Sequence, residues 1–228
     1  MPISIAETVE ATRACVAAGA DALHLHVRNG AGHHSLDIGL YKEALAEVQA
    51  TLPRLPVQVT TEAAGVFDVA AQLAVIRDLK PDWASVALRE VAAEPELART
   101  LYETAADQGT ELQHIIYDEA DAALLAAHQR GGLLTEDASV ILVLGRYAQD
   151  FQSDPADLPA LRATLPPVGK WMLCAFGRNE HACLRAAARL GGDMRVGFEN
   201  SHTDADGVAW PDMASSVKAL RNSLEAAE

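Results

Sequence analysis

The chain has 228 residues, half of them hydrophobic, and carries a formal net charge of −14. This length predicts one sizeable globular core, whereas the acidic balance argues against nucleic acid as a partner, because phosphates attract clustered lysine and arginine. No run approaches the roughly 18 to 20 apolar residues of a membrane span, and the first ten residues lack the pattern of a signal peptide.

The chain is predicted to begin with a helix. Ser4 and Glu7 have the spacing of a capping box, the helical pattern continues to Ala18, and Gly19 stands where such a helix would end. Downstream, short β-rich runs alternate with helical patterns rich in alanine and leucine. The predicted strands cover 22–27, 56–62, 83–88, 112–118, 139–145, 170–176 and 194–199. The predicted helices between them cover 40–52, 69–79, 95–108, 120–130 and 180–192.

This strict alternation is typical of parallel βαβ units with right-handed crossovers. With so many units, the sequence favours a single α/β domain over residues 1–228, a TIM-type (β/α) barrel. A doubly wound open sheet is the alternative, although no G-x-G-x-x-G follows a first strand. Seven strands are found where a complete barrel has eight, and the chain starts with a helix. We therefore expect a barrel that lacks the usual first strand.

Three polar residues alternate with aliphatic ones in the run "ALHLHVR". Because successive side chains of a strand point to opposite faces, His24, His26 and Arg28 are expected to share one face. Near the end of the chain, Arg195 and Glu199 are expected to share a face of the strand over 194–199. Both patterns lie toward the carboxyl ends of strands, where barrels carry their catalytic groups.

Two imidazoles and one carboxylate are the protein ligands of many catalytic zinc ions, because they leave a fourth position for water or substrate. His24, His26 and Glu199 are therefore candidate ligands of zinc (Zn²⁺), and Arg195 would hold the carboxylate or neutralise an anionic substrate. Each pattern also has a plain structural explanation. An inward histidine can be a hydrogen-bonded core residue, and an Arg–Glu pair can be a structural ion pair.

Further polar residues on the middle strands are candidates for a substrate pocket. Thr60 and Glu62 are expected on one face of the second strand, together with Gln58, and Glu62 and Glu90 lie just past strand ends, where a general acid or base could stand. His114 belongs to a run that is apolar on both faces, so either it or its neighbour Gln113 points inward. For both glutamates, the alternative is a solvated loop carboxylate.

The segments "AGADALHLHVR", "SLD" and "LCAFGRNEHACLRAAARLGGDMRVGFENS" resemble the β-keto acid cleavage enzymes, the family of 3-keto-5-aminohexanoate cleavage enzymes. The resemblance is densest over 19–28 and 170–200 and runs over nearly the whole chain. It implies a zinc-dependent (β/α) barrel that is usually homo-oligomeric. It also implies that His24, His26 and Glu199 bind the metal and that Arg195 positions the acid that works on the substrate.

Members of this family exchange the acyl group of a β-keto acid with acetyl-CoA in a retro-Claisen-type reaction. The residue after the zinc glutamate is commonly an aspartate that acts as general base, and here it is Asn200. Because an amide cannot take a proton near neutral pH, Asn200 could orient a substrate but not deprotonate it. A carboxylate, Glu62 or Glu90, would then move protons, while Thr60, Arg28 and His114 are candidate substrate contacts.

The sequence thus favours a zinc-dependent C–C bond lyase or transferase acting on a β-keto acid, with acetyl-CoA as a possible co-substrate. A metal hydrolase of the amidohydrolase type is one alternative, because it also opens with His-x-His on a barrel strand. A barrel that binds metal but has lost catalysis is another. The three cysteines lie in apolar surroundings, which favours reduced thiols and a cytoplasmic location.

Overall fold

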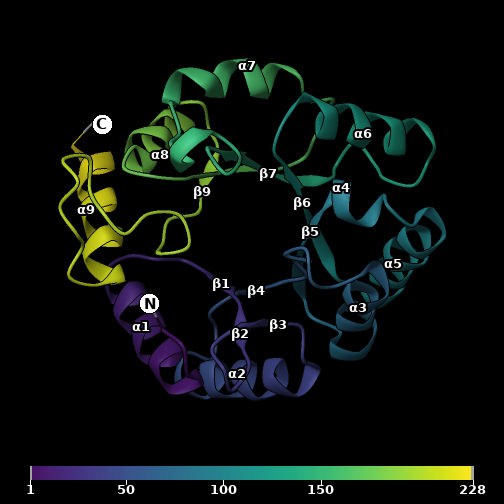
Figure 1. Ribbon diagram of the computed structural model, residues 1–228, viewed down its shortest axis with the longest axis horizontal. Coiled ribbons are helices and arrows are strands. Elements are labelled where there is room, and N and C mark those ends of the chain that lie inside the picture. Colours follow the sequence, from purple (N-terminus) through teal and green to yellow (C-terminus); the bar gives the residue numbers. More distant parts are fainter. Residues whose placement is uncertain (1, 227–228) are drawn as a thin grey trace. The chain divides into compact units, whose positions relative to one another are not determined.

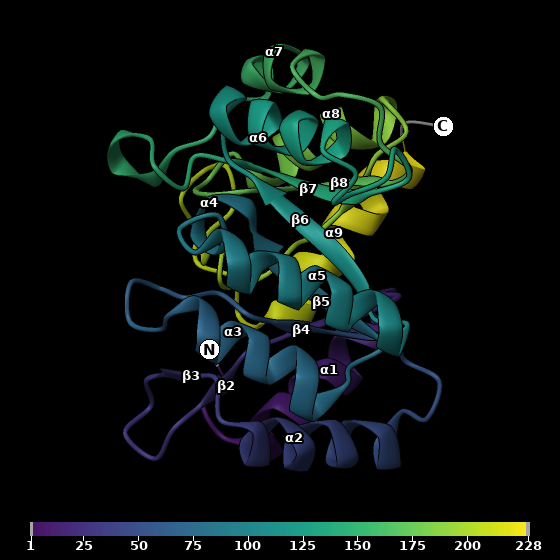
Figure 2. The ribbon, with the colours of Figure 1, turned by 90° about the vertical axis from the view of Figure 1, so that its right-hand side faces the viewer.

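The computed structural model describes residues 2–226. These residues form two compact units. The first unit comprises residues 2–16 and 20–114, and the second comprises 17–19 and 115–226. Figures 1 and 2 show the elements in chain order along the colour gradient.

Helix α1 (Ile5–Ala17) opens the chain with the predicted capping box. The Glu7 amide donates to the Ser4 hydroxyl at 3.2 Å, and the Glu7 carboxylate accepts from the Ser4 amide at 2.9 Å. Two amide groups that the first helical turn leaves without partners are satisfied in this way. Within residues 2–226, no strand precedes β1, which agrees with the expected absence of a first barrel strand.

The first unit contains parallel strands in the order β1-β4-β5-β6. They are β1 (Leu23–Leu25), β4 (Val57–Thr60), β5 (Trp83–Ala87) and β6 (Glu111–Ile116), the last of which passes into the second unit. The helices are α2 (Ile38–Thr51), α3 (Val69–Ala74) with a π-helical continuation η1 (Val75–Leu79), α4 (Leu88–Val91) and α5 (Pro95–Gln108). Val59 and Val86 are completely buried, as expected for strands covered on both faces.

The predicted strand over 22–27 is interrupted at His26. Residues Val27–Arg28 form β2, which pairs antiparallel with β3 (His34–Ser35). The turn between them is stabilised by Asn29, whose side-chain oxygen accepts from the amides of Ala31 and His33 at 3.0 and 3.1 Å. No strand was predicted at His34, but this side-chain turn folds it back beside Arg28.

The second unit continues the parallel order as β6-β7-β8-β9. Its strands are β7 (Ser139–Leu144), β8 (Trp171–Ala175) and β9 (Asp193–Met194). Its helices are α6 (Glu119–Arg130), α7 (Leu158–Ala163), α8 (Glu180–Arg189) and α9 (Met213–Glu225), with short 3-10 turns η2 (Gln149–Phe151) and η3 (Pro155–Asp157). Figure 2 shows α6, α7 and α8 on one side of β7 and β8.

The predicted last strand, 194–199, is shorter than expected. Arg195 still donates its amide to the Leu173 carbonyl at 2.8 Å, but the chain then turns. The amides of Asn200 and Ser201 both donate to the Gly197 carbonyl, at 2.9 and 3.1 Å. Arg195 and Glu199 therefore meet across a turn rather than as alternate residues of a strand.

The alternation of strands and helices is the pattern predicted from the sequence, and each predicted strand overlaps an observed one. The expectation of a single domain over 1–228 stays a prediction. None of the helices in the described residues is both long enough and apolar enough to cross a lipid bilayer.

Candidate metal and substrate site

His24 and His26 turn their imidazoles toward each other. Their Nε2 atoms lie 3.1 Å apart, and the ring planes are inclined at 70° with centroids 5.0 Å apart. Zinc–nitrogen bonds are about 2.0–2.1 Å long, and two such bonds place their nitrogens roughly 3–3.4 Å apart at ordinary coordination angles. The separation of the two Nε2 atoms therefore fits a shared cation.

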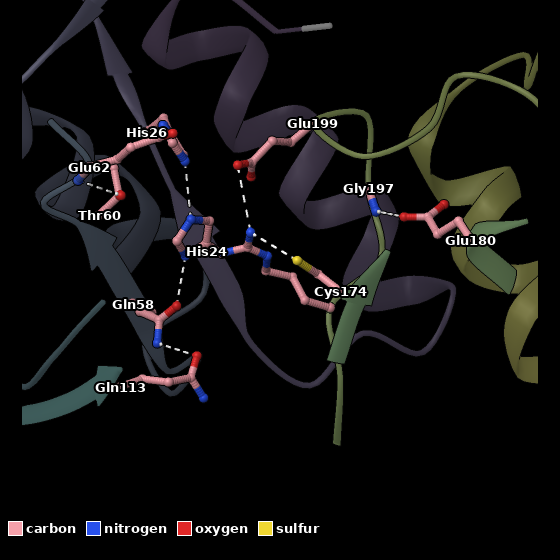
Figure 3. A network of polar contacts seen from close by, with 11 residues as sticks. His24, His26, Gln58, Thr60, Glu62, Gln113, Cys174, Glu180, Gly197 and Glu199 are labelled. Atoms are coloured by element: carbon pink, nitrogen blue, oxygen red, sulfur yellow. Dashed lines mark hydrogen bonds and ion pairs between the residues drawn. The ribbon is translucent and has the colours of Figure 1, made fainter. Parts of the chain in front are cut away.

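A pair of buried glutamines orients His24. Its Nδ1 lies 2.7 Å from the Gln58 side-chain oxygen, and the Gln58 amide nitrogen donates to the oxygen of Gln113 at 3.1 Å (Figure 3). Because the amide oxygen only accepts, Nδ1 carries the proton in this network and Nε2 presents its lone pair. A hydrogen bond of this kind is the usual partner of a metal-binding histidine. Gln58 was predicted on the inward face, but this role was not.

His34 is a third histidine that the sequence analysis did not assign to the site. Its ring lies 5.2 Å from the His26 ring and 5.6 Å from the Phe67 ring. Its Nε2 donates to the Glu62 carbonyl at 2.9 Å, and burial lowers the pKa of His34. The signal for this placement was weak, because only the cross-strand pairing of Arg28 with His34 brings the ring back to the strand end.

The predicted pocket residues of strand β4 are held by the backbone around them. The Thr60 hydroxyl accepts from the Glu62 amide at 3.0 Å, and buried Tyr41 donates to the Thr60 carbonyl at 2.9 Å. Glu90 accepts from the Ala63 amide at 3.0 Å and from Gln72 at 2.8 Å, and burial raises its pKa. Glu90 is thus not a solvated loop carboxylate, because its hydrogen bonds hold the segment after β4 in place.

Two candidate substrate contacts have different placements. The Arg28 side chain donates to the Gly32 carbonyl at 3.0 Å, which ties it to the turn between β2 and β3. His114 stacks on Tyr102 of helix α5 with ring centroids 5.7 Å apart. Its side chain therefore faces the helix layer, and the inward position on β6 belongs to Gln113. The hypothesis that His114 contacts substrate does not fit this placement.

In the second unit, Arg195 lies between a carboxylate and a thiol. One of its guanidinium nitrogens is 3.6 Å from the Glu199 carboxylate and donates to the Cys174 sulfur at 3.4 Å. Arg195 is largely buried, with 13% of its side chain exposed, whereas Glu199 is 37% exposed. Burial raises the pKa of Cys174 to about 11, so the thiol is neutral at physiological pH. This arrangement is the ion pair that the sequence predicted between Arg195 and Glu199.

Glu180 supports the same turn and was missed by the sequence analysis. It is the first residue of α8 and only 1% exposed, and its carboxyl group accepts from the Gly197 amide at 3.1 Å. Burial raises the pKa of Glu180 to about 8. An acidic residue in the first turn of a helix is common, so the sequence alone offers no sign of this contact.

Asn200 follows Glu199 and is 7% exposed. Its carbonyl accepts from the Gly177 amide at 3.0 Å, which joins the turn to the end of β8. The side-chain nitrogen of Asn200 is buried and has no hydrogen-bond partner within residues 2–226. A buried donor without a partner is costly, so this nitrogen can donate to a bound ligand.

Comparison with solved structures identifies the class of fold. The chain superimposes on ObcA, in its apo form and in a ternary complex with a C4-CoA adduct and oxalate, with TM-scores of 0.76 and 0.77 at 16% and 17% identity. These matches cover 99% of this chain and 62–64% of the ObcA chains, so the chain spans less than two thirds of that protein. They confirm the α/β fold of the TIM-barrel type.

The family follows from the sequence as a whole. The model of the beta-keto acid cleavage enzyme family matches residues 1–228, and the chain belongs to this family. A 3-oxoadipate:acetyl-CoA acetyltransferase of Cupriavidus necator is 25% identical over 214 residues, covering 88% of this chain and 73% of the relative. A 3-keto-5-aminohexanoate cleavage enzyme of Fusobacterium nucleatum is 21% identical over 210 residues, with coverage of 88% and 75%.

Proposed function

We propose that this protein is a zinc-dependent enzyme that exchanges the acyl group of a β-keto acid with acetyl-CoA. The observation that carries the proposal is the pair of facing Nε2 atoms of His24 and His26, with His24 oriented by Gln58. Membership of the beta-keto acid cleavage enzyme family supports the reaction class. So does the name of the Cupriavidus relative, which is an acetyl-CoA acetyltransferase of the β-keto acid 3-oxoadipate.

The proposed metal ligands are His24, His26 and Glu199. Two imidazoles and a carboxylate suit zinc and leave a position for substrate. When bound, the metal ion supplies Lewis-acid chemistry at the keto oxygen. Arg195, beside Glu199, orients the carboxylate.

The proposed reaction is balanced without an oxidant or a reductant. A β-keto acid, R–CO–CH2–COO⁻, and acetyl-CoA give acetoacetate and R–CO–S-CoA. Arg195 would stabilise the anion that develops when the C–C bond breaks. Asn200 would donate from its buried side-chain nitrogen to the substrate. The chain's substitution of this amide for the family's aspartate leaves proton transfer to another group.

We assign proton transfer to Glu62. Glu90, the other candidate, already accepts from the Ala63 amide and from Gln72, and so it holds the segment after β4. Glu62 is half-buried, and its backbone is fixed by Thr60 and His34. The Thr60 hydroxyl and Arg28 are proposed substrate contacts, since a hydroxyl that accepts one hydrogen bond can still donate another.

We also propose that the enzyme is a homo-oligomer of the cytoplasm. The family resemblance suggests the oligomer, and the presence of Cys15, Cys174 and Cys183 as buried thiols favours a reducing compartment. Sedimentation of the purified protein tests the first point. A single monomeric species at micromolar concentration contradicts it.

The function is tested by a panel of β-keto acids with and without acetyl-CoA, followed by chromatography of the acyl-CoA products. We expect turnover that requires acetyl-CoA and is lost on metal removal and in His24→Ala. Full activity in metal-depleted protein contradicts the metal role. Hydrolysis of lactones or amides without an acyl acceptor indicates the amidohydrolase-type alternative, which the placement of His114 against Tyr102 does not favour.

A second candidate function is a metal-binding barrel that has lost catalysis. Asn200 favours it, because this position cannot act as a base. In that case the protein binds metal and a β-keto acid but turns over neither substrate, and Asn200→Asp restores turnover. Turnover by the natural chain excludes this alternative.

A further inference from the structure

Five side chains of the second unit form what we call the aromatic cluster: Tyr117, Arg146, Tyr147, Phe151 and Phe176. The Arg146 guanidinium carbon lies 6.0 Å from the Tyr147 ring, 5.9 Å from the Phe151 ring and 5.4 Å from the Phe176 ring. Tyr117 and Tyr147 meet edge to face with centroids 4.9 Å apart. A guanidinium group within about 6 Å of ring centroids is attracted to their faces, so one cation is surrounded by aromatic rings.

The cluster stands at the carboxyl ends of three neighbouring parallel strands. Tyr117 directly follows β6, Arg146 lies two residues beyond the end of β7, and Phe176 directly follows β8. Carboxyl ends of parallel strands are where barrel enzymes build their binding sites. The aromatic cluster thus lies at the edge of the sheet where barrel enzymes bind their ligands, and not at the opposite edge.

The aromatic residues are concentrated here although the chain is poor in them. It has four tyrosines and four phenylalanines, and half of these eight belong to the cluster. Tyr147 is 68% exposed and Phe151 is 53% exposed. Exposure of two large rings beside each other has a cost in water, and grouped exposed apolar side chains commonly mark a binding surface.

The loop that carries these rings is fixed at its base. A side chain at Gly145 would approach the Ser153 amide to 2.8 Å, and one at Gly177 would approach the Phe151 carbonyl to 2.6 Å, so both glycines allow close packing. Ser153 donates from its amide and from its hydroxyl to the Phe176 carbonyl, at 3.0 and 2.8 Å. Asp150 and Phe151 both adopt left-handed φ angles, 58° and 50°. Such backbone strain persists where the surroundings enforce it, often at ligand sites.

We propose that the aromatic cluster binds the adenine nucleotide of acetyl-CoA, with the base stacked on Tyr147 and Phe151 and a phosphate paired with Arg146. This inference rests on the proposed function and names where its co-substrate is held. Tyr117 contacts Tyr147. The cluster therefore belongs to the same unit as Arg195, the arginine assigned to the reaction.

The chemistry of the cluster suits a nucleotide. Aromatic side chains stack on bases regardless of sequence, and the edge of an arginine held over a ring still presents N–H donors to a phosphate. A chain with a net charge of −14 repels polyanions in general, and Arg146 supplies a positive charge beside the exposed rings. The exposure of the rings suits the part of a large ligand that stays near solvent.

The test uses adenosine 3′,5′-bisphosphate as the probe and isothermal titration calorimetry of the full chain. We expect Tyr147→Ala and Arg146→Ala each to weaken binding about tenfold, the loss expected for one stacked base or one phosphate contact. Tyr147→Phe keeps the ring and should bind as the natural chain does. Arg189→Ala removes the same charge from an exposed position on α8 and should bind normally.

Absence of binding to the natural chain, or equal binding by all four variants, overturns the proposal. The proposal is also overturned if the two alanine variants bind an aryl β-keto acid more weakly than the natural chain but bind the nucleotide equally well. These results are separate from a failure of the proposed function. The calorimetry measures the nucleotide alone, whereas the proposed function fails only when no β-keto acid is turned over with acetyl-CoA.

Discussion

His24 and Gln58 are directly opposite each other on the parallel strands β1 and β4, and their side chains meet with Nδ1 and Oε1 2.7 Å apart. The register of two strands thus sets the tautomer of an imidazole. Gln58 is itself held by Gln113, from β6. Three strands of one unit therefore determine which nitrogen of His24 is presented to a metal.

Replacing Gln58 by leucine should weaken zinc binding 10- to 100-fold, as loss of such an orienting hydrogen bond commonly does. The imidazole remains, but its Nδ1–H loses the acceptor that fixes the ring. Competition with a chromophoric chelator measures the dissociation constant. Gln108→Leu, which removes a glutamine that contacts the Arg77 carbonyl, is the control and should bind zinc normally. Unchanged affinity in Gln58→Leu would show that ring orientation does not limit binding.

His24→Ala and His26→Ala should each lose the equimolar zinc that we expect in the natural protein. His34→Ala should retain it, because the Nε2 atom of His34 is occupied by the Glu62 carbonyl. Elemental analysis of freshly purified protein gives the zinc content, and circular dichroism establishes that each variant is folded. Loss of zinc in His34→Ala alone would assign the metal to a different pair of histidines.

Glu180 should make the free energy of unfolding depend on pH. Burial raises its pKa from 4.5 to about 8 in the folded protein, so the folded state holds this proton where the unfolded state has released it. The stabilising contribution is therefore complete below about pH 4.5 and is lost as the pH rises to about 8. The full change is about 3–5 kcal/mol by linkage. Urea unfolding between pH 5 and 9 measures it.

Glu180→Gln keeps the acceptor for the Gly197 amide and removes the ionisation. Its stability should fall less between pH 5 and 9 than that of the natural chain. Glu43→Gln, on the exposed side of α2, is the matched control and should retain the natural pH dependence. Parallel curves for the natural chain and Glu180→Gln would mean that Glu180 does not carry the proton.

Arg195→Lys should lower kcat/KM for a β-keto acid about 10- to 100-fold, an effect of about 1.4–2.7 kcal/mol on the barrier. Lysine keeps the charge, but it lacks the planar guanidinium that places one nitrogen near both Glu199 and Cys174. Steady-state kinetics check this, with Arg185→Lys on α8 as the control. An unaffected kcat/KM in Arg195→Lys would mean that only the charge matters.

The strands and helices were predictable because their signals are local. The alternation in "ALHLHV" places the two histidines together, and the capping box of Ser4 and Glu7 starts the first helix. The interruption at His26 and the hairpin to His34 were not predicted, because they depend on how one asparagine side chain closes a turn. The contact of Glu180 with Gly197 joins residues 17 apart in sequence and has no pattern at all.

The residues of the predicted site likewise divide into those that local patterns place and those that only the folded structure places. Arg195 and Glu199 were paired correctly, but by the wrong geometry, since the chain turns after Gly197 where a strand was expected. Gln58 was placed on the correct face without its function, which requires knowing the register of β1 and β4. His114 was ambiguous because its strand is buried on both sides, and only the position of Tyr102 decides the matter.

The neutral thiol of Cys174 affects how the charge of Arg195 is balanced in the second unit. Because the sulfur carries no charge below about pH 11, it is Glu199 rather than Cys174 that compensates the nearby guanidinium of Arg195. If a metal ion binds that carboxylate, the carboxylate no longer neutralises the positive charge of Arg195. Binding of the metal would then strengthen the attraction of Arg195 for the carboxylate of an organic acid, so that the metal binds before the acid does.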